Sequence, residues 1–446
     1  MKDSGIEWIG EIPDEWNLIP LKRIIINRAG GAWGEEPTEN NAVICLRIAD
    51  FDFSNGRFLN KNFDLLTKRS YSKEQVNKLA LLKDDICIEK SGGGEKTPVG
   101  RAVIFDKNYQ ALFANFMDRL RVNKEKAFPL YVEYYLQGMY FRDVTKLYIK
   151  QTIGIQNLNL TYLLEKEVIT LPPLDEQKKI ADYLDDRCSK IDEIITGTTA
   201  SIEDYKKLKQ AVIAEVTIKG LNNSAMMKDT PFIWMGKIPK HWELKPFKYI
   251  LYERNEKNNP IKSRERLSLS IDKGVTLYAE KTTNLDRFKD DFTAYKLAYE
   301  GDLVMNCMNM IVGASGVSKY FGCVSPVYYT YYDNEPDHIK AKYCAYLFQN
   351  RLLMRLLHSM GRGILSFDKG EDRVNTCRLK ISRNDLRSLI LPHPPLSEQK
   401  EIANYLDKKI GNIDDIITEK TGLIEDLKAY KKSLIYEVVT GKKRIK

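Results

Sequence analysis

Apolar residues recur at helical spacing in two long stretches of the chain, 175–219 and 397–440. In the first stretch, one series of apolar residues repeats at multiples of seven positions: Leu184, Ile191, Tyr205 and Val212. A second series occupies neighbouring helix positions: Ile180, Ile194, Ile202, Leu208 and Val216. The second stretch repeats this pattern with Ile402, Leu406, Ile413, Ile416, Ile417, Ile424, Leu427, Leu434 and Val438. A seam of this period predicts two long helices that each need an apolar partner. Antiparallel pairing of the two is favoured over each helix folding back on its own domain, because the seam is continuous.

The segments before each helix have a different pattern. Short apolar runs such as 43–48, 86–88 and 101–105 alternate with turns rich in Gly and Asn, which is typical of strands. Tyr- and Leu-rich stretches at 130–136 and 343–348 have helical spacing and are predicted to be core. The predicted fold class is therefore α+β. The two mixed α/β domains are predicted at 1–174 and 220–396. The first long helix is predicted at 175–219, and 397–446 holds the second long helix and a basic tail. The two helices are predicted to form an antiparallel coiled coil.

The chain is a tandem duplication of a unit of roughly 220 residues. Residues 8–16 and 234–242 share Trp-x-Gly-x-Ile-Pro-x-x-Trp, and 172–185 and 394–407 share Pro-Pro-Leu-x-Glu-Gln-Lys-x-Ile-Ala-x-Tyr-Leu-Asp. The middles of the two copies, 30–165 and 255–385, share little. Divergent interiors on one scaffold favour different ligands, although drift in loops gives the same pattern.

Composition narrows the class of protein. The length of 446 residues allows about three domains at ~150 residues each. Seven widely spaced cysteines without a Cys-x-x-Cys pair argue against a disulfide framework or a zinc site. No stretch is long and apolar enough for a membrane span, and the first residues lack the apolar core of a signal peptide. We therefore expect a cytoplasmic protein without membrane contact.

The net charge of +9 is unevenly spread. Residues 220–396 hold 27 Lys and Arg against 19 Asp and Glu, which accounts for +8 of the excess. A basic domain fits a polyanionic partner, but this balance is also common on ordinary protein surfaces.

A search for catalytic motifs finds none that qualifies. The glycine-rich run 91–97 lacks the Gly-Lys-Ser/Thr ending of a phosphate-binding loop, so a loop against a nucleic-acid backbone or a plain hairpin tip is favoured. No Gly-x-Gly-x-x-Gly follows a predicted strand, and the sequence has no Gly-x-Ser-x-Gly elbow. It also lacks the Asn/Asp-Pro-Pro-aromatic tetrapeptide of enzymes that methylate amino groups, and its few histidines show no spacing that suggests a metal site. The sequence predicts a binding or adaptor subunit, not an enzyme.

The two duplicated motifs, in this order and spacing, resemble the specificity subunit of type I restriction–modification systems over the whole chain. The resemblance implies that each middle is a target recognition domain reading one half of an asymmetric, bipartite double-stranded DNA sequence. It also implies that the helices space the domains and dock two methyltransferase subunits, to which endonuclease/translocase subunits add. Adenosylmethionine, ATP and magnesium are then expected on these partners, with no cofactor, metal or catalytic residue in this chain.

Polar and basic side chains on loops are the expected DNA contacts, because base edges and phosphates are bound by Arg, Lys, Asn, Gln, Ser and Thr. The candidates in the first domain are Lys90, Ser91, Lys96, Thr97, Arg101, Lys150, Gln151, Thr152, Gln156 and Asn157. The candidates in the second are Asn306, Asn309, Ser315, Arg362, Lys369, Arg373 and Arg378. For each single residue, an ordinary solvated surface position is the competing interpretation.

Two other functions remain open at this stage. A free-standing two-domain DNA-binding regulator would use the same helices for its own assembly and would bind DNA unaided. A purely structural scaffold would need no basic excess in 220–396, so the charge argues mildly against it.

Overall fold

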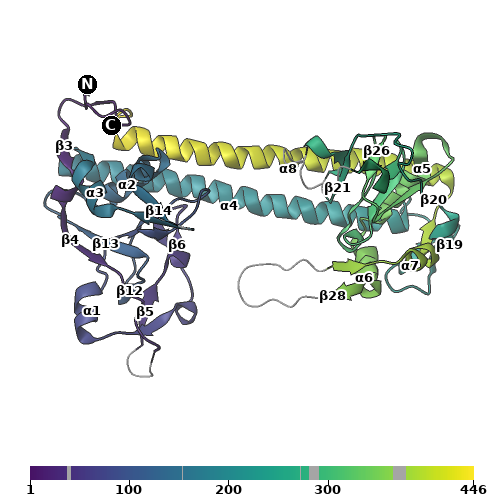
Figure 1. The fold of residues 1–446 in the computed structure, drawn as a ribbon, viewed down its shortest axis with the longest axis horizontal. Helices are drawn as coiled ribbons and strands as arrows, with labels where there is room; N and C mark the ends of the chain where they lie inside the picture. Colours follow the sequence, from purple (N-terminus) through teal and green to yellow (C-terminus); the bar gives the residue numbers. More distant parts are fainter. Residues whose placement is uncertain (38–41, 153, 272, 281–290, 365–377, 446) are drawn as a thin grey trace. The chain divides into compact units, whose positions relative to one another are not determined.

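The structure is a computed structural model that describes residues 1–37, 42–152, 154–271, 273–280, 291–364 and 378–445 (Figure 1). It contains two compact units, one formed by residues 1–200 with 420–446 and the other by 201–419. The long helices α4 (Leu174–Lys219) and α8 (Leu396–Val439) each contribute one half to each unit. No helix in the described ranges is long and apolar enough to cross a membrane.

The first unit is built around a mixed sheet with the strand order β4-β13-β9-β11-β7-β6. These strands are β4 (Ile25–Gly30), β6 (Phe51–Asp52), β7 (Arg57–Phe58), β9 (Ile86–Glu89), β11 (Ala102–Ile104) and β13 (Met117–Val122). Smaller sheets have the orders β12-β5-β8, β10-β15-β14, β16-β3 and β1-β2. Their strands are β1 (Lys2–Asp3), β2 (Glu11–Ile12), β3 (Asn17–Pro20), β5 (Ala42–Leu46), β8 (Lys68–Ser70), β10 (Ser91–Gly92), β12 (Ala111–Phe113), β14 (Ile149–Thr152), β15 (Ile155–Leu158) and β16 (Val168–Leu171). Three helices complete this unit, α1 (Lys73–Leu79), α2 (Pro129–Phe141) and α3 (Leu160–Lys166).

The second unit repeats the centre of that sheet with the order β20-β27-β24-β25. Its strands are β17 (Met227–Asp229), β18 (Lys237–Pro239), β19 (Glu243–Pro246), β20 (Tyr252–Arg254), β21 (Leu267–Ser270), β22 (Gly274–Leu277), β23 (Lys296–Ala298), β24 (Leu303–Asn306), β25 (Ser315–Val317), β26 (Gly322–Val324), β27 (Tyr328–Tyr332), β28 (Arg362–Ile364), β29 (Arg378–Lys380) and β30 (Ile390–His393). Its shorter helices are α5 (Ile339–Leu347), α6 (Arg351–Met360) and α7 (Arg383–Ser388). The two middles therefore share a core topology that their sequences do not reveal.

The duplicated motifs are structural. In Trp-x-Gly-x-Ile-Pro-x-x-Trp the isoleucine and second tryptophan are core residues, with Ile12 and Ile238 at 0% exposure and Trp16 and Trp242 at 1%. The motif glycine has a positive φ in both copies, a conformation that side chains with a Cβ rarely adopt. These positions are therefore constrained by packing in each unit.

The second motif fixes the start of each long helix. Gln177 and Gln399 are fully buried, and each side-chain amide donates to the carbonyl of the first proline of its Pro-Pro pair, at 2.8 and 2.7 Å. The Gln177 amide oxygen also accepts from the backbone N–H of Phe128 at the start of α2. The glutamine thus joins the last strand of a domain to its long helix.

Within each unit α4 and α8 lie side by side and antiparallel (Figure 1). In the first unit, Ile180, Leu184 and Ile191 of α4 share a core with Leu434 and Val438 of α8. The corresponding halves share the core of the second unit. The predicted antiparallel pairing is confirmed.

The predicted phase of the seam is wrong at two positions. Ile194 and Leu208 are 51% and 43% exposed, whereas Ile213, which was not assigned to the seam, is fully buried. A heptad repeat drifts around a straight helix of 3.6 residues per turn, so the later members of a series can turn away from the partner.

Two equivalent ion pairs join the helices. In the first unit, Lys431 Nζ contacts the two Asp192 oxygens at 2.7 and 2.5 Å; in the second, Lys209 Nζ contacts the Asp414 oxygens at 2.6 and 2.7 Å. The Lys431 side chain is 8% exposed against 20% for Lys209, and it also donates to the Ser54 carbonyl. Burial raises the pKa of Asp192, and Lys431 opposes this shift. Lys431 therefore ties the β6–β7 turn of the first domain to both long helices.

Replacing Lys431 with Met is expected to destabilise the first unit by about 2–4 kcal/mol, because Asp192 keeps its partly buried charge without a partner. The matched variant Lys209→Met removes a more exposed pair and should cost about 1 kcal/mol or less. Urea unfolding followed by hydrogen exchange of each unit measures both values. Equal losses for the two variants would contradict the added role of Lys431.

A buried charge cluster adjoins this ion pair. Arg57 on β7 donates to Asp185 on α4 at 2.5 Å, and its other terminal nitrogen lies 3.8 Å from the Glu133 carboxylate on α2. Glu133 is fully buried, and this burial raises its pKa to about 8 despite Arg57. Tyr134, the neighbour of Glu133, also donates to Asp185. In the second unit the equivalent contact is Tyr346 Oη to Asp407 at 2.6 Å.

The raised pKa of Glu133 makes stability depend on pH. The unfolded carboxyl ionises near 4.5 and the folded one near 8, so its stabilising contribution is complete below about pH 4.5 and is lost as pH rises to about 8. Glu133→Gln, which stays neutral, is expected to match the parent near pH 4.5 and to be more stable by about 1–3 kcal/mol at pH 8. Urea unfolding across this pH range is the measurement. A difference independent of pH would show that Glu133 stays ionised in the folded unit.

Candidate nucleic-acid interface

Two groups of predicted residues from distant parts of the sequence meet in one small sheet of the first unit. β10 pairs with β15, which pairs with β14, so that Ser91 lies opposite Asn157 and Asn157 opposite Lys150. Ser91 Oγ donates to Asn157 Oδ1 at 2.7 Å. The backbone N–H of Leu158 donates to the Lys90 carbonyl at 2.7 Å and extends the pairing. We call these three strands the hairpin sheet.

The faces of the hairpin sheet differ. Lys150 and Asn157 are exposed, whereas Gln156 is buried and its amide oxygen accepts from the backbone N–H of Val99 at 3.3 Å. Gln151 is exposed and contacts Gln156 at 3.4 Å. Lys150, Asn157 and Ser91 thus form a polar row across three strands, and Gln156 anchors the sheet to the glycine-rich loop.

The glycine-rich loop ends in a turn that presents Lys96 and Thr97. Both side chains are exposed, and Gly94 and Thr97 exchange backbone hydrogen bonds of 3.0 and 3.2 Å. Gly93 has φ +60°, and a Cβ there would lie 2.9 Å from the Val99 backbone nitrogen and 3.0 Å from Gln156 Oε1. The glycine lets the loop approach the hairpin sheet closely.

An ion-pair group links Lys90 to a residue that sequence reasoning missed. Lys90 and Arg28 bind the two oxygens of Asp118, each at 2.7 Å, and Arg28 also donates to Thr161. Asp118 is 2% exposed, so the two cations hold their positions. Arg28 lies on β4, next to β13, and only the sheet pairing places it beside Lys90. The Arg28 side chain remains about one third exposed, at 32%.

Arg101 is engaged within the domain. Its guanidinium donates to both oxygens of the buried Glu89, at 2.9 and 3.2 Å, and stacks over the Phe53 ring at 3.6 Å. Burial raises the pKa of Glu89, and Arg101 lowers it. In this conformation the donors of Arg101 are largely occupied, so it supports the loop more than it presents a free cation.

The second unit has an equivalent hairpin. β28 pairs with β29, which places Arg362 opposite Lys380, and both side chains are exposed. The backbone N–H of Ile381 donates to the Cys307 carbonyl at 3.1 Å, as Leu158 does to Lys90 in the first unit. Arg362 and Lys380 therefore correspond to Lys150 and Asn157. Lys380 is a second residue that the sequence reasoning missed, because its role depends on cross-strand register.

The remaining candidates of the second unit have different surroundings. Asn309 is exposed, and Asn306 is half-buried with its side chain accepting from the Met308 backbone N–H at 3.0 Å. Ser315 is fully buried, and its hydroxyl donates to the Ala345 carbonyl. The Ser315 side chain is therefore not at the surface in this structure. Lys369 and Arg373 lie outside the described residues, and Thr152 and Arg378 are described for their backbone alone.

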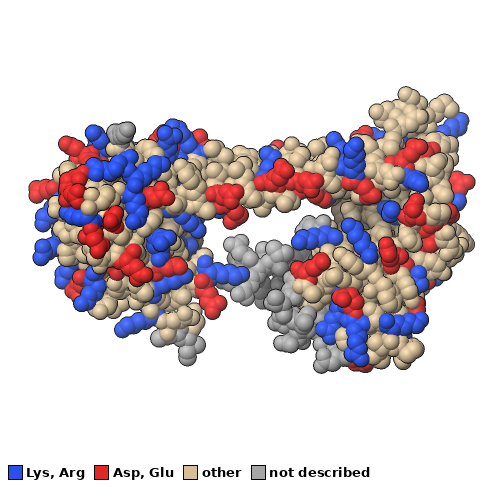
Figure 2. Space-filling view, turned by 90° about the horizontal axis from the view of Figure 1, so that it is seen from above, with Lys and Arg blue, Asp and Glu red and all other residues tan. Residues whose placement is uncertain are grey.

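Charge alone does not mark these surfaces. On the face drawn in Figure 2, Lys and Arg are interspersed with Asp and Glu over both units. Within the described ranges, no group of three or more His, Cys, Asp or Glu side chains is placed to hold a metal ion. The repeated hairpin with different side chains is thus the more informative feature. The same backbone with different side chains suits the two units to bind different ligands of the same chemical class.

Comparison with known proteins points to DNA as the class of ligand. The family described as "Type I restriction modification DNA specificity domain" matches residues 49–204. The putative type I restriction enzyme MjaX specificity subunit of Methanocaldococcus jannaschii is 26% identical over 98% of this chain and 96% of its own length. Over nearly its whole length the chain is therefore similar to type I restriction–modification specificity subunits. These non-catalytic subunits recognise the DNA sequence.

One further relative and two solved structures are also similar to the chain. The specificity subunit of the StySPI enzyme from Salmonella potsdam is 22% identical over 50% of this chain and 46% of its own. A chain from a study of complex assembly and conformational transition of the type I R-M system shares the fold with a TM-score of 0.67 and 15% identity, over 97% of this chain and 100% of that chain. The HsdS subunit of Thermoanaerobacter tengcongensis has a TM-score of 0.53 and 14% identity, over 97% and 98%.

Proposed function

We propose that each unit of this chain reads one half of an asymmetric, bipartite double-stranded DNA target. The observation that carries the proposal is the hairpin shared by both units with different side chains, Lys150 and Asn157 in one and Arg362 and Lys380 in the other. Lysine and arginine bind phosphates or guanine, and asparagine binds adenine, so the two hairpins favour different base sequences. The glycine-rich loop with Lys96 and Thr97 adds backbone contacts in the first unit.

We further propose that the paired helices dock two methyltransferase subunits, to which the endonuclease/translocase subunits add. Equivalent helix positions are apolar and exposed, with Leu208 at 43% and Tyr430 at 53%. These two residues stand 222 positions apart, the same offset that relates the two copies of the motifs. Exposed apolar side chains at repeated positions favour two equivalent protein contacts.

Cofactors belong to the partners in this proposal. The sequence has no motif for adenosylmethionine or ATP. We therefore assign adenosylmethionine, ATP and magnesium to the methyltransferase and endonuclease subunits.

The isolated chain is expected neither to methylate nor to cut DNA, whereas addition of its methyltransferase subunit should yield methylation of one bipartite sequence. Sequencing of methylated DNA after reaction with and without the partner is the measurement. Methyl transfer from adenosylmethionine by rigorously partner-free chain would overturn the assignment. Tight, sequence-specific DNA binding by the chain alone, with no effect of the partner, would instead favour a free-standing regulator.

A further inference from the structure

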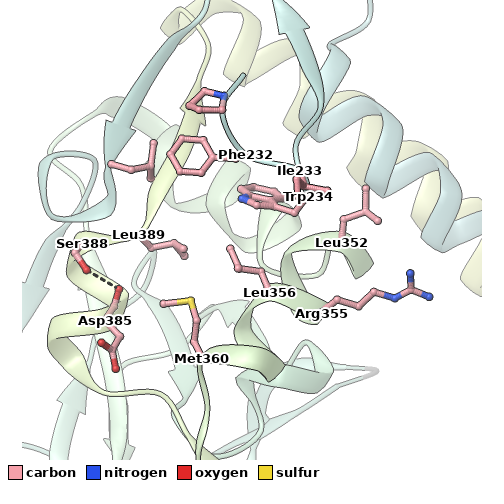
Figure 3. Close-up of a pocket in the computed structure, with 12 residues that line it drawn as sticks. Phe232, Ile233, Trp234, Leu352, Arg355, Leu356, Met360, Asp385, Ser388 and Leu389 are labelled. Atoms are coloured by element: carbon pink, nitrogen blue, oxygen red, sulfur yellow. Dashed lines mark hydrogen bonds between the residues drawn. The ribbon is translucent and has the colours of Figure 1, made fainter. Parts of the chain in front are cut away.

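The second unit has an apolar groove beside the first tryptophan of its Trp-x-Gly-x-Ile-Pro-x-x-Trp motif. Its volume is about 700 Å³, and Leu352, Leu356 and Met360 of α6 line it together with Trp234 and Leu389 (Figure 3). Ile233, at its edge, is fully exposed. We call this hollow the Trp234 groove. Ile233 is continuous with the apolar lining and enlarges the exposed apolar surface there, as surfaces covered by another protein do.

The first unit fills the same place with its own side chains. There Trp8 packs against the Tyr135 ring at 5.5 Å, and its indole N–H donates to Glu167 Oε2 at 3.4 Å. The other oxygen of Glu167 accepts from the Tyr148 hydroxyl. One aromatic ring and one carboxylate thus contact this tryptophan, and Tyr148 binds the carboxylate.

All three of these side chains are replaced by aliphatic ones in the second unit. Glu167 and Leu389 are equivalent, because each follows the short helix and its carbonyl accepts a matching bond, from Leu21 N in one unit and Phe247 N in the other. Tyr131 and Tyr343 fix the helix register by donating to Val439 O and Thr217 O. This register aligns Tyr135 with Leu347. The hairpins align Tyr148 with Met360, because each stands two residues before the equivalent positions Lys150 and Arg362.

The replacements leave a polar group without a partner. Among the described residues, the buried Trp234 Nε1 has no hydrogen-bond acceptor. In Figure 3 this nitrogen lies on the Leu389 side of the ring, where the first unit has its glutamate. A buried N–H without an acceptor is unfavourable, because it has lost its hydrogen bond to water. The nitrogen is shielded from solvent, so an acceptor from a partner reaches it only after a lining side chain shifts.

We propose that the Trp234 groove docks a segment of the methyltransferase subunit that presents an aromatic or aliphatic side chain next to a carboxylate. The first unit supplies that chemistry internally with Tyr148 and Glu167. Arg355, which is exposed at the rim and has no described ion pair, complements the acidic group. The docking surface lies on the second recognition domain and is separate from the exposed positions of the long helices.

The position of the groove argues for the methyltransferase as the partner. Met360 ends α6, and Arg362 begins β28 of the proposed DNA-binding hairpin two residues later. An enzyme that methylates a base within the sequence read by this hairpin must sit beside it. The inference therefore rests on the proposed function and adds a contact specific to the second unit.

Two variants test this docking with the full chain and the methyltransferase subunit of its own system. Ile233→Glu places a charge at a fully exposed position, where folding is not at risk, and reproduces Glu7 of the first unit. The double variant Met360→Tyr with Leu389→Glu fills the groove with the side chains of the first unit. Each is expected to weaken association with the methyltransferase subunit about tenfold or more in calorimetric titration.

The matched control is Leu65→Glu, which makes the same change at a surface leucine of the first unit that is 73% exposed. It should bind like the parent. Parent-like association of both groove variants would overturn the docking proposal while the proposed function stands. Parent-like association combined with weaker DNA binding would also overturn it and would place the groove against DNA. Failure of the unaltered chain to bind its methyltransferase subunit would overturn the proposed function itself.

Discussion

Exchanging residues 30–165 for the corresponding segment of another specificity subunit is expected to change one half of the methylated sequence and leave the other half intact. These residues hold the hairpin sheet, the glycine-rich loop and most of the first mixed sheet, all within the first unit. The second unit has its own sheet and hairpin, built from 201–419. Each proposed reading surface is therefore complete within one unit.

The exchanged segment must keep the contacts that hold the first domain on the long helices. Tyr131 donates to the Val439 carbonyl of α8, and Tyr134 donates to Asp185 of α4. Both have equivalents in the second unit, Tyr343 and Tyr346, so a donor segment with tyrosines at these two positions should fit. A donor without them serves as the control for misfolding.

Sequencing of methylated DNA from cells with the exchanged chain measures the outcome. The reciprocal exchange of 255–385 should alter the other half. Simultaneous change of both halves, or of neither, in a folded and active chain would contradict independent reading by the two domains.

The sequence predicted the parts of this fold that depend on local patterns. The two long helices follow from periodicity, whereas repetition revealed the duplication but not that Trp16 and Trp242 are buried. The common strand order of the two middles could not be predicted. Core strands tolerate many different apolar residues, so the two middles keep the same strands without keeping similar sequences. The exposed side chains of Ile194 and Leu208 show the limit of a heptad pattern on its own.

For the candidate DNA contacts, the sequence indicated the residue types, but only the fold shows which of them lie together. Polar loops pointed to Ser91, Lys150 and Asn157, but their alignment in one row depends on pairing between β10, β14 and β15. The sequence could not distinguish Arg101 from these residues, since its partner Glu89 is buried only in the folded sheet. Arg28 was missed for the same reason.

Lys150→Ala and Asn157→Ala are expected to weaken DNA binding by the assembled complex in different ways. Lys150 is exposed on an edge strand, where a flexible cation binds phosphate, so its loss should reduce affinity for all sequences. It should also lower the slope of log affinity against log salt by about 1. Asn157 lies in the centre of the row, and its amide can pair with a base edge. Its loss should cost about 1–3 kcal/mol on the target and little on unrelated DNA.

Lys150 and Asn157 lie in the same small sheet, so a difference between the two variants reflects the roles of the side chains and not their surroundings. Ser91 Oγ, which donates to Asn157, would lose its acceptor in Asn157→Ala, so Asn157→Asp is the companion variant that keeps the acceptor and removes the amide donor. Lys124→Ala is the control for charge, since that lysine is 63% exposed and pairs with Asp84 instead. Fluorescence titration of target and scrambled duplexes at several salt concentrations measures affinity and slope together. Unchanged discrimination in both Asn157 variants would remove this residue from base readout, and an unchanged salt slope in Lys150→Ala would remove the lysine from phosphate contact.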